Sequence, residues 1–269
     1  MSYGDEQQPL AIAHRGGAGL APENTLAAFA RSSALGVRYL ESDIKLTADG
    51  ELVCFHDELL DRCTDGRGRI GAHTLKQLRD VRVEGTEPIP TLAEALEAFP
   101  DARFTIDLKD QAAIEPLARL LQRRDFAERL CVAGAWDSWL EQLRSQAPGV
   151  RTALGWRSLT TLIACSKAGA PIPARTLRGR FAHVPISLGR VPVFADRLVA
   201  RTHRLGLRLV VWTVDDPELM HRLLDAGVDG LISDRPDILR EVMISRGQWL
   251  PMETVSGGAN RDTSRHQTA

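Results

Sequence analysis

Short apolar stretches alternate with amphipathic stretches from one end of the chain to the other. Such alternation is typical of parallel strands that are connected by covering helices. Eight stretches are predicted as parallel strands: Leu10–Ala13, Tyr39–Ile44, Arg103–Lys109, Leu130–Ala135, Arg151–Trp156, Phe181–Ser187, Arg208–Val214 and Gly230–Ser233. Eight strands within 269 residues favour a closed barrel. We therefore predict an α/β fold, a (β/α)8 TIM barrel.

Capping residues mark the boundaries of several predicted helices. Thr91 and Glu94 have the spacing of a capping box ahead of an apolar-periodic stretch. Asp216 followed by Pro217 predicts an N-cap with proline at the first helical position, and Gly227 is expected to end that helix. These signals support helices between the strands.

Two segments interrupt the regular alternation. A ninth strand, Glu51–His56, is predicted to pair with the second strand after a turn at Thr47–Gly50. Residues 58–90 are irregular and rich in Gly, Arg and Asp, so we predict a small insertion after this hairpin. The expected organisation is an N-terminal arm at 1–9, a barrel domain at 10–247 that contains the insertion, and a disordered polar tail at 248–269.

Composition narrows the possible classes of protein. A net charge of -1 argues against a nucleic-acid partner, since such proteins usually carry a basic excess. We expect no transmembrane segment, because no apolar run approaches 18 residues. Residues 1–9 lack the layout of a signal peptide, and the four cysteines include no CxxC pair. A cytoplasmic protein with reduced thiols is expected.

Two carboxylates on the second strand point to a cation. Glu41 and Asp43 are two positions apart, so they share one face of the strand. Their mutual repulsion would be relieved by one hard divalent cation, either Mg²⁺ or Ca²⁺. The pattern alone is weak, because such a pair more often lies at a solvated strand edge.

The predicted hairpin brings a histidine to the same face. A four-residue turn at 47–50 would pair Leu46 with Glu51, Asp43 with Cys54 and Glu41 with His56. Directly opposed residues share a face, so His56 would lie beside the two acids. A register shift of one residue would remove it from them.

Two further strand ends carry charged side chains. Asp107 and Lys109 share a face, which makes them either a simple salt bridge or part of a site at the carboxyl end of the barrel. His14 and Arg15 precede two glycines directly after the first strand. Arginine matches phosphate oxygens and histidine transfers protons near neutral pH. With a cation on Glu41, Asp43 and Asp107, the set suits hydrolysis of a phosphodiester.

These residues together resemble the glycerophosphodiester phosphodiesterase family. The similarity extends from about residue 10 to 240, in the family's order. Its motifs are His14-Arg15-Gly16, Pro22-Glu23-Asn24-Thr25, Glu41-x-Asp43, Thr47-x-Asp49-Gly50, His56-Asp57, Ile89-Pro90-Thr91-Leu92-x-Glu94, Asp107-x-Lys109, Trp212-Thr213-Val214-Asp215 and Gly227-Val228-Asp229-Gly230.

The resemblance implies an enzyme that hydrolyses glycerophosphodiesters to glycerol 3-phosphate and an alcohol with a divalent cation. It assigns the metal to Glu41, Asp43 and Asp107, acid–base catalysis to His14 and His56, phosphate binding to Arg15 and Lys109, and the glycerol contact to Trp212. The family commonly has glutamate where this chain has Asp107, a shorter acid with the same charge and ligating atoms.

Two alternatives remain beside this hypothesis. The first is phospholipase D-type cleavage of lysophospholipids or sphingolipids, in whose barrel aspartate also occurs at the position of Asp107. We find no sequence pattern for an exposed apolar lip that would hold a lipid tail, and residues 58–90 are very polar. The second is a non-catalytic module that binds a phosphate ligand, which would have no need to retain every acid, histidine and basic residue.

Overall fold

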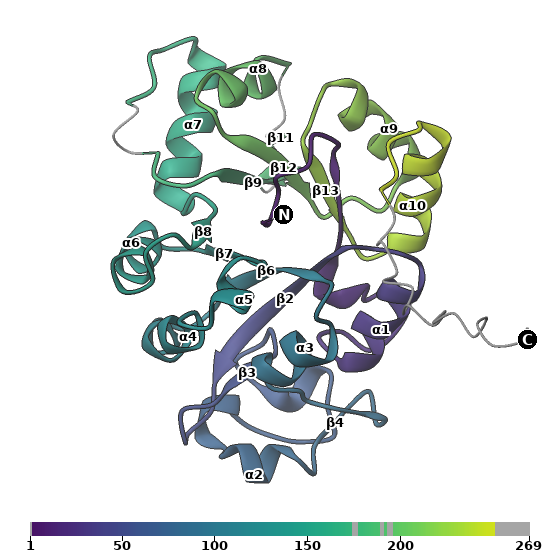
Figure 1. Cartoon of the computed structure of the whole chain (residues 1–269), viewed down its shortest axis with the longest axis vertical. Helices are drawn as coiled ribbons and strands as arrows, with labels where there is room; N and C mark the ends of the chain where they lie inside the picture. Colours follow the sequence, from purple (N-terminus) through teal and green to yellow (C-terminus); the bar gives the residue numbers. More distant parts are fainter. Residues whose placement is uncertain (1, 174–176, 189–190, 193–195, 251–269) are drawn as a thin grey trace, which may run out of the picture.

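The computed structural model describes residues 2–173, 177–188, 191–192 and 196–250. Its main sheet contains eight parallel strands in the order β8-β7-β6-β2-β1-β13-β12-β9. A parallel bridge between Ala153, directly after β8, and Phe181 of β9 brings the two ends of the sheet together. The predicted (β/α)8 barrel is therefore confirmed, with its strands inside and its helices outside (Figure 1).

The barrel strands are β1 (Leu10–Ala13), β2 (Tyr39–Leu46), β6 (Arg103–Leu108), β7 (Leu130–Gly134), β8 (Arg151–Thr152), β9 (Phe181–Pro185), β12 (Arg208–Trp212) and β13 (Gly230–Ser233). Short antiparallel strands outside the barrel are β3 (Leu52–Cys54), β4 (Arg82–Val83), β5 (Glu87–Pro88), β10 (Ser187–Leu188) and β11 (Val191–Pro192). The predicted strand at 151–156 is mostly loop and helix, because α7 begins at Trp156.

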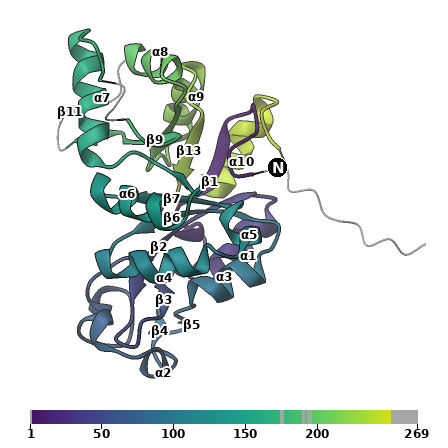
Figure 2. The ribbon, with the colours of Figure 1, turned by 60° about the vertical axis from the view of Figure 1, so that its left-hand side comes forward.

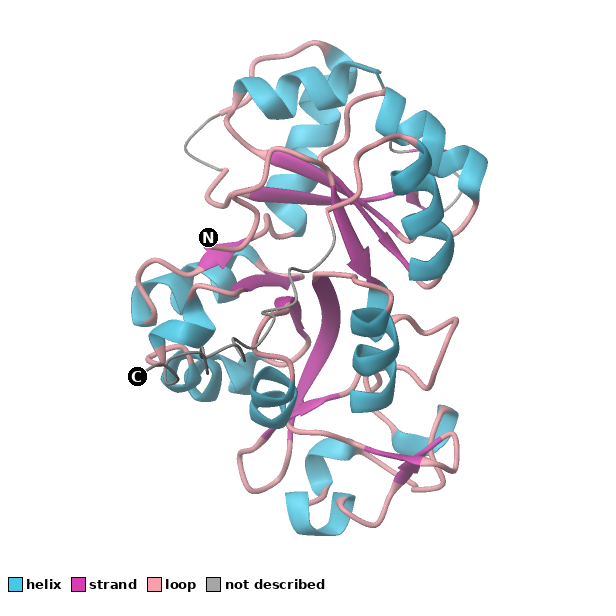
Figure 3. Ribbon diagram, turned by 45° about the vertical axis from the view of Figure 1, so that its right-hand side comes forward, coloured by secondary structure: helices cyan, strands magenta, loops and turns pink. Residues whose placement is uncertain are grey.

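Helices cover the outer face of the sheet (Figure 3). They are α1 (Leu26–Ala34), α2 (Leu75–Leu78), α3 (Leu92–Ala98), α4 (Ile114–Leu120), α5 (Arg124–Ala127), α6 (Asp137–Gln146), α7 (Trp156–Ala168), α8 (Asp196–Arg204), α9 (Pro217–Asp225) and α10 (Pro236–Ser245). Both sequence-predicted caps are present: Thr91 and Glu94 form a complete capping box at α3, and Asp216 caps α9 ahead of Pro217.

Side chains alternate between the interior of the barrel and the helical layer. In β1, Leu10 and Ile12 join an interior cluster that also contains Tyr39 of β2, whereas Ala13 packs on the outside. Since residues two positions apart share a face, Glu41 and Asp43 follow Tyr39 into the barrel. The same alternation in β6 directs Thr105 and Asp107 inward.

The first residues of the chain cover the amino end of the barrel. Tyr3 is fully buried and makes edge-to-face contacts with Tyr39 and Phe181, the first residues of β2 and β9. Its hydroxyl lies 2.5 Å from the hydroxyl of Thr105. Arg208 holds the following backbone by donating to the carbonyl oxygens of Gly4 and Glu6. The opposite, carboxyl end of the barrel carries the charged residues of the predicted site.

The insertion has a small apolar cluster of its own. Its α2, β4 and β5 lie at one end of the molecule, away from α7 and α8 (Figure 2). Buried side chains from the insertion pack together with Val53 and Phe55 of the hairpin return: Leu60, Ile70, Leu78, Val83 and Ile89. The insertion is thereby attached to the segment that carries His56.

The register predicted for the hairpin is wrong by one residue. Leu46 pairs with Leu52 and Ile44 pairs with Cys54. Thr47 N–H donates to the Glu51 carbonyl, which leaves a three-residue turn at 48–50 that ends on Gly50 at φ 86°. A positive-φ residue at the end of a three-residue turn is a common hairpin geometry. The ladder ends at Cys54, so the register does not decide the direction of His56.

All four cysteines are free, and Cys54 and Cys131 are buried. Cys63 and Cys165 are partly exposed, so two of the four predicted packed thiols are buried. Among the helices of the described ranges, none has both the length and the apolar character needed to cross a bilayer. Most of the predicted tail, residues 251–269, lies outside the described residues.

Candidate active site

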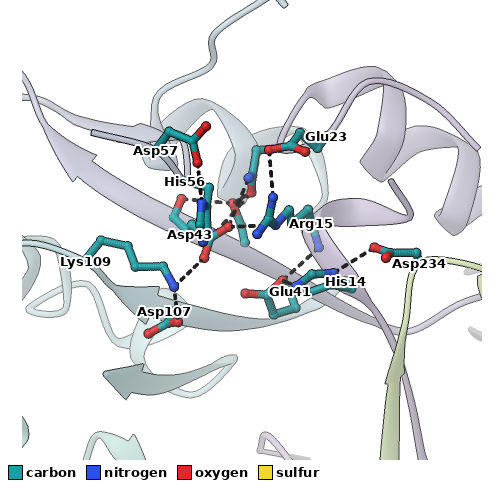
Figure 4. A network of polar contacts seen from close by, with 12 residues as sticks. His14, Arg15, Glu23, Glu41, Asp43, His56, Asp57, Asp107, Lys109 and Asp234 are labelled. Carbon is teal, nitrogen blue, oxygen red and sulfur yellow. Dashed lines mark hydrogen bonds and ion pairs between the residues drawn. The ribbon is translucent and has the colours of Figure 1, made fainter. Parts of the chain in front are cut away.

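A pocket of about 500 Å³ opens at the carboxyl end of the barrel. Active sites of TIM barrels are built at this end, from the loops that follow the strands. All eight residues assigned from the sequence line this one pocket: His14, Arg15, Glu41, Asp43, His56, Asp107, Lys109 and Trp212. Figure 4 shows all of them except Trp212, together with Glu23, Asp57 and Asp234.

His14 lies directly after β1 and is oriented by Asp234. Its Nδ1 lies 2.7 Å from Asp234 Oδ1. An ionised carboxylate only accepts, so Nδ1 is the donor and neutral His14 carries its lone pair on Nε2, 3.9 Å from Glu41 Oε2. Burial opposes protonation, but the hydrogen bond to Asp234 and the charge of Glu41 outweigh it and raise the pKa of His14.

Glu41 is a buried acid that receives little neutralisation. The backbone N–H of Arg15 donates to its Oε2 at 2.8 Å, from a left-handed backbone conformation at φ 49°. Burial and the neighbouring charge of Asp43 raise the pKa of Glu41 to about 7. A carboxyl in this state would gain stability from a cation nearby.

Asp43 and Asp107 are direct neighbours on β2 and β6. Lys109 Nζ lies between them, 3.0 Å from Asp43 Oδ1 and 2.5 Å from Asp107 Oδ2. Burial disfavours the charge of Asp43, but Lys109, His56 and Arg15 lower its pKa overall. The salt bridge that the sequence suggested between Asp107 and Lys109 is present, and it lies within the pocket.

The donor set suits a hard cation, although the side chains are not gathered around one point. Glu41, Asp43 and Asp107 supply the carboxylate oxygens that Mg²⁺ and Ca²⁺ prefer. Within the described ranges, no three Asp, Glu, His or Cys side chains are grouped as ligands of one ion. Lys109 holds Asp43 and Asp107 instead, so ligation by all three acids requires its ammonium group to move aside.

His56 leaves the hairpin return and is oriented by its neighbour. Its Nδ1 lies 2.6 Å from Asp57 Oδ1, which directs the tautomer as Asp234 does for His14. Asp57 also accepts from Arg62 Nε of the insertion. Arg62 Nη2 donates to Glu23 at 2.5 Å, and Glu23 in turn accepts from Arg15 Nη1 at 2.9 Å. Arg62 therefore connects the partners of His56 and Arg15.

Three residues with positioning roles were not found from the sequence. Asn24 accepts from the Asp43 backbone N–H at 3.1 Å and donates to its Oδ2 at 3.2 Å, so it fixes both ends of that residue. Asp234 acts through His14, and Arg62 acts through Asp57. Glu23 and Asn24 belong to the Pro22–Thr25 motif, which was the available signal for Asn24. Asp234 and Arg62 lie outside the motifs.

The remaining wall of the pocket is uncharged. Trp212, the last residue of β12, contributes to it together with His183 of β9. Burial lowers the pKa of His183 to about 4, and its Nε2 has no hydrogen-bond partner among the described residues. His183 is therefore a neutral wall residue.

Residues 14–238 match the sequence model of the glycerophosphoryl diester phosphodiesterase family. The chain belongs to this family. The predicted enzyme class, a glycerophosphodiester phosphodiesterase, is confirmed by the same match and by curated relatives. The matched range includes all eight residues assigned from the sequence.

Two relatives match the chain over most of its length. "Probable glycerophosphodiester phosphodiesterase 2" of Mycobacterium tuberculosis is 37% identical over 247 residues, which are 89% of this chain and 92% of the relative. A glycerophosphodiester phosphodiesterase of Caldanaerobacter subterraneus is 33% identical and covers 86% and 96% of the two chains. An Oleispira antarctica phosphodiesterase, solved with the product sn-glycerol-3-phosphate, has the same fold at a TM-score of 0.72, 24% identity and coverage of 88% and 97%.

Proposed function

We propose that this chain hydrolyses glycerophosphodiesters to glycerol 3-phosphate and an alcohol by acid–base catalysis with His14 and His56. The observation that carries the proposal is that both histidines line one pocket with Arg15 and Lys109. Each histidine has its Nδ1 bound to a carboxylate, so Nε2 is the ring nitrogen that remains for proton transfer. The glycerol 3-phosphate bound to the Oleispira relative supports the same product.

In the proposed reaction, His14 accepts the proton of the attacking oxygen, which belongs to water or to the glycerol 2-hydroxyl. As the new P–O bond forms, the bond between phosphorus and the alcohol oxygen breaks, and His56 donates a proton to that oxygen. The two roles can be exchanged without changing the balance of protons. After attack by the 2-hydroxyl, water opens the cyclic phosphate. Arg15 and Lys109 hold the phosphate oxygens, and Trp212 packs against glycerol.

We also propose that Glu41, Asp43 and Asp107 hold one divalent cation, Mg²⁺ or Ca²⁺. Two features support the proposal: the three acids line one pocket, and the pKa of Glu41 is raised to about 7 by burial and Asp43. The cation would supply neutralisation of the phosphoryl charge. Lys109, once released from the two acids, would be free to bind the phosphate.

Activity of single variants tests the catalytic roles. We expect His14→Ala and His56→Ala each to lower kcat for glycerophosphocholine about a hundredfold or more, the scale typical of lost acid–base catalysis. His73→Ala is the matched control, because His73 lies in the insertion and is absent from the pocket lining. Product analysis should find glycerol 3-phosphate and choline. Parental activity in either pocket variant would refute the assignment, and release of phosphocholine would refute the proposed bond cleavage.

A further inference from the structure

The uncharged side of the pocket carries an apolar rim. Of the five tryptophans in the chain, four line this pocket. Trp136 follows β7 directly before α6, Trp139 lies in the first turn of α6 and Trp156 is the first residue of α7; all three line the pocket, and we call them the tryptophan rim. Trp136 is 60% exposed and Trp156 is 37% exposed. Exposed aromatic side chains beside a pocket are a common sign of a binding surface.

The rim is held in place by specific contacts between its two loops. Trp156 N–H donates to the Ala135 carbonyl at 2.9 Å. Asp137 accepts from the backbone N–H groups of Arg157 and Ser158 at the start of α7. A Cβ on Gly155 would lie 2.5 Å from the backbone nitrogen of Asp137, so the close approach of the loops requires glycine. The exposed rings are therefore part of a built edge.

Aliphatic side chains continue the surface from the rim into the pocket. Leu154 and Leu159 line it on the side of β8 and α7, and Ala133 and Ala135 line it on the side of β7. In the described part of the chain, no charged residue lines the pocket on these two strands and their loops. The charged residues come from β1, β2, β6 and the hairpin return. The pocket thus has a charged side and an apolar side.

The geometry points to the tryptophan rim as a subsite for a hydrocarbon group on the alcohol part of the substrate. This inference rests on the proposed function, in which Arg15 and Lys109 bind the phosphate and Trp212 contacts the glycerol. Trp212 lies on β12, separated from β8 by β9, whereas the rim begins on β7, the strand next to Lys109. The alcohol group leaves the phosphate on the side of the rim.

The sequence interpretation found no apolar lip, and the structure corrects that interpretation. Trp136 and Trp156 are separated by twenty positions and belong to different strand–helix loops. The two connections come together because β7 and β8 are neighbours in the barrel, and the Trp156 N–H donates to the Ala135 carbonyl. A trimethylammonium group would also fit aromatic faces. The aliphatic lining favours uncharged hydrocarbon, because its walls offer no π face to a cation.

A series of glycerophosphodiesters with unbranched alkyl alcohols, from ethanol to octanol, tests the inference. For the unchanged enzyme we expect KM to fall about fourfold per methylene until the rim is covered, from the typical free energy of methylene burial. Trp136→Ala combined with Trp156→Ala should remove this dependence on length. The same variant should still turn over the ethanol ester, so that the dependence on length can be measured in it. Trp136→Phe should keep most of the dependence on length.

Ile244→Ala is the matched control, since Ile244 is 45% exposed on α10 and is absent from the pocket lining. It should retain the full dependence on length. A KM that does not change with alkyl length would overturn the inference. So would a length dependence that survives in the double variant. The parent enzyme could instead prefer glycerophosphocholine over its uncharged dimethylbutanol isostere and lose this preference in the double variant. That result would show that the rim binds a cation and would overturn the hydrocarbon assignment.

Binding without turnover separates this inference from the proposed function. Calorimetry should show that octyl phosphate binds at least tenfold more tightly than ethyl phosphate to the unchanged protein, and equally weakly to the double variant. This result would support the rim even if no glycerophosphodiester were hydrolysed. Equal binding of both probes to the unchanged protein would overturn it. Efficient release of choline from lysophosphatidylcholine that is lost in the double variant would mean that the rim binds the acyl chain on the glycerol. That result would refute the assignment of the rim to the alcohol part.

Discussion

His183 is expected to lower the stability of the fold as the pH falls below neutral. Its side chain is 8% exposed, and burial lowers its pKa to about 4 from an ordinary value of 6.5. The unfolded chain therefore binds a proton at a higher pH than the folded chain does. Below pH 6.5, protonation favours the unfolded state, and the loss of stability ends only below the folded pKa of about 4.

The size of this effect follows from the two pKa values. Between about pH 7 and about pH 5, protonation of the unfolded chain at this one position costs about 2 kcal/mol of unfolding free energy. His183→Leu removes the titration and keeps the site apolar. The free energy of unfolding by urea should be measured for the parent protein and for His183→Leu at a series of pH values. Carboxylates that titrate in both proteins cancel in the difference between the two free energies.

The expected result is a difference that shifts by about 2 kcal/mol in favour of His183→Leu between about pH 7 and about pH 5. The absolute difference at pH 7 reports on packing and does not enter the test. A difference that stays constant across this range would refute the assignment of His183 as a buried neutral wall residue.

Three further variants test other contacts. Tyr3→Ala should cost about 3 to 5 kcal/mol in urea unfolding because a fully buried ring is lost from the barrel base, and an unchanged midpoint would show that this base does not need it. Arg62→Ala should lower kcat/KM for glycerophosphocholine about tenfold by releasing Asp57 and Glu23, with partial recovery in Arg62→Lys; equal activity of all three proteins would contradict a positioning role. Asp234→Ala should lower kcat about tenfold to a hundredfold through His14, and a change confined to KM would argue against orientation of the base.

Much of the barrel follows from local patterns. The apolar stretches define where strands lie, and β1 and β13 have the predicted limits because glycine, charged residues and turns bound them closely. Strand alternation also directs Glu41 and Asp43 to one face, and this holds whatever the rest of the fold does. The strand predicted at 151–156 is shortened to Arg151–Thr152 with a bridge at Ala153, because α7 begins at Trp156.

The other parts of the site depend on tertiary structure. Asp234 reaches His14 only because β13, from the other end of the sequence, pairs with β1 in the barrel. Arg62 reaches Glu23 only through the folding of the insertion. The error in the hairpin register arose from the length of the turn. Thr47 pairs with Glu51, so the turn has three residues, whereas four were predicted. Local patterns contain no information about such contacts.

The rate of glycerol 3-phosphate release from glycerophosphocholine, before chelation, after EDTA and after restoring Mg²⁺ or Ca²⁺, tests the central proposal most directly. We expect EDTA to abolish turnover and one of the two cations to restore it in the parent protein. In a variant with Asp43→Asn and Asp107→Asn, restoration should require far more cation, because two of the proposed ligands have lost their charge. Full turnover in EDTA, or identical cation dependence of parent and variant, would contradict a divalent cation on Glu41, Asp43 and Asp107.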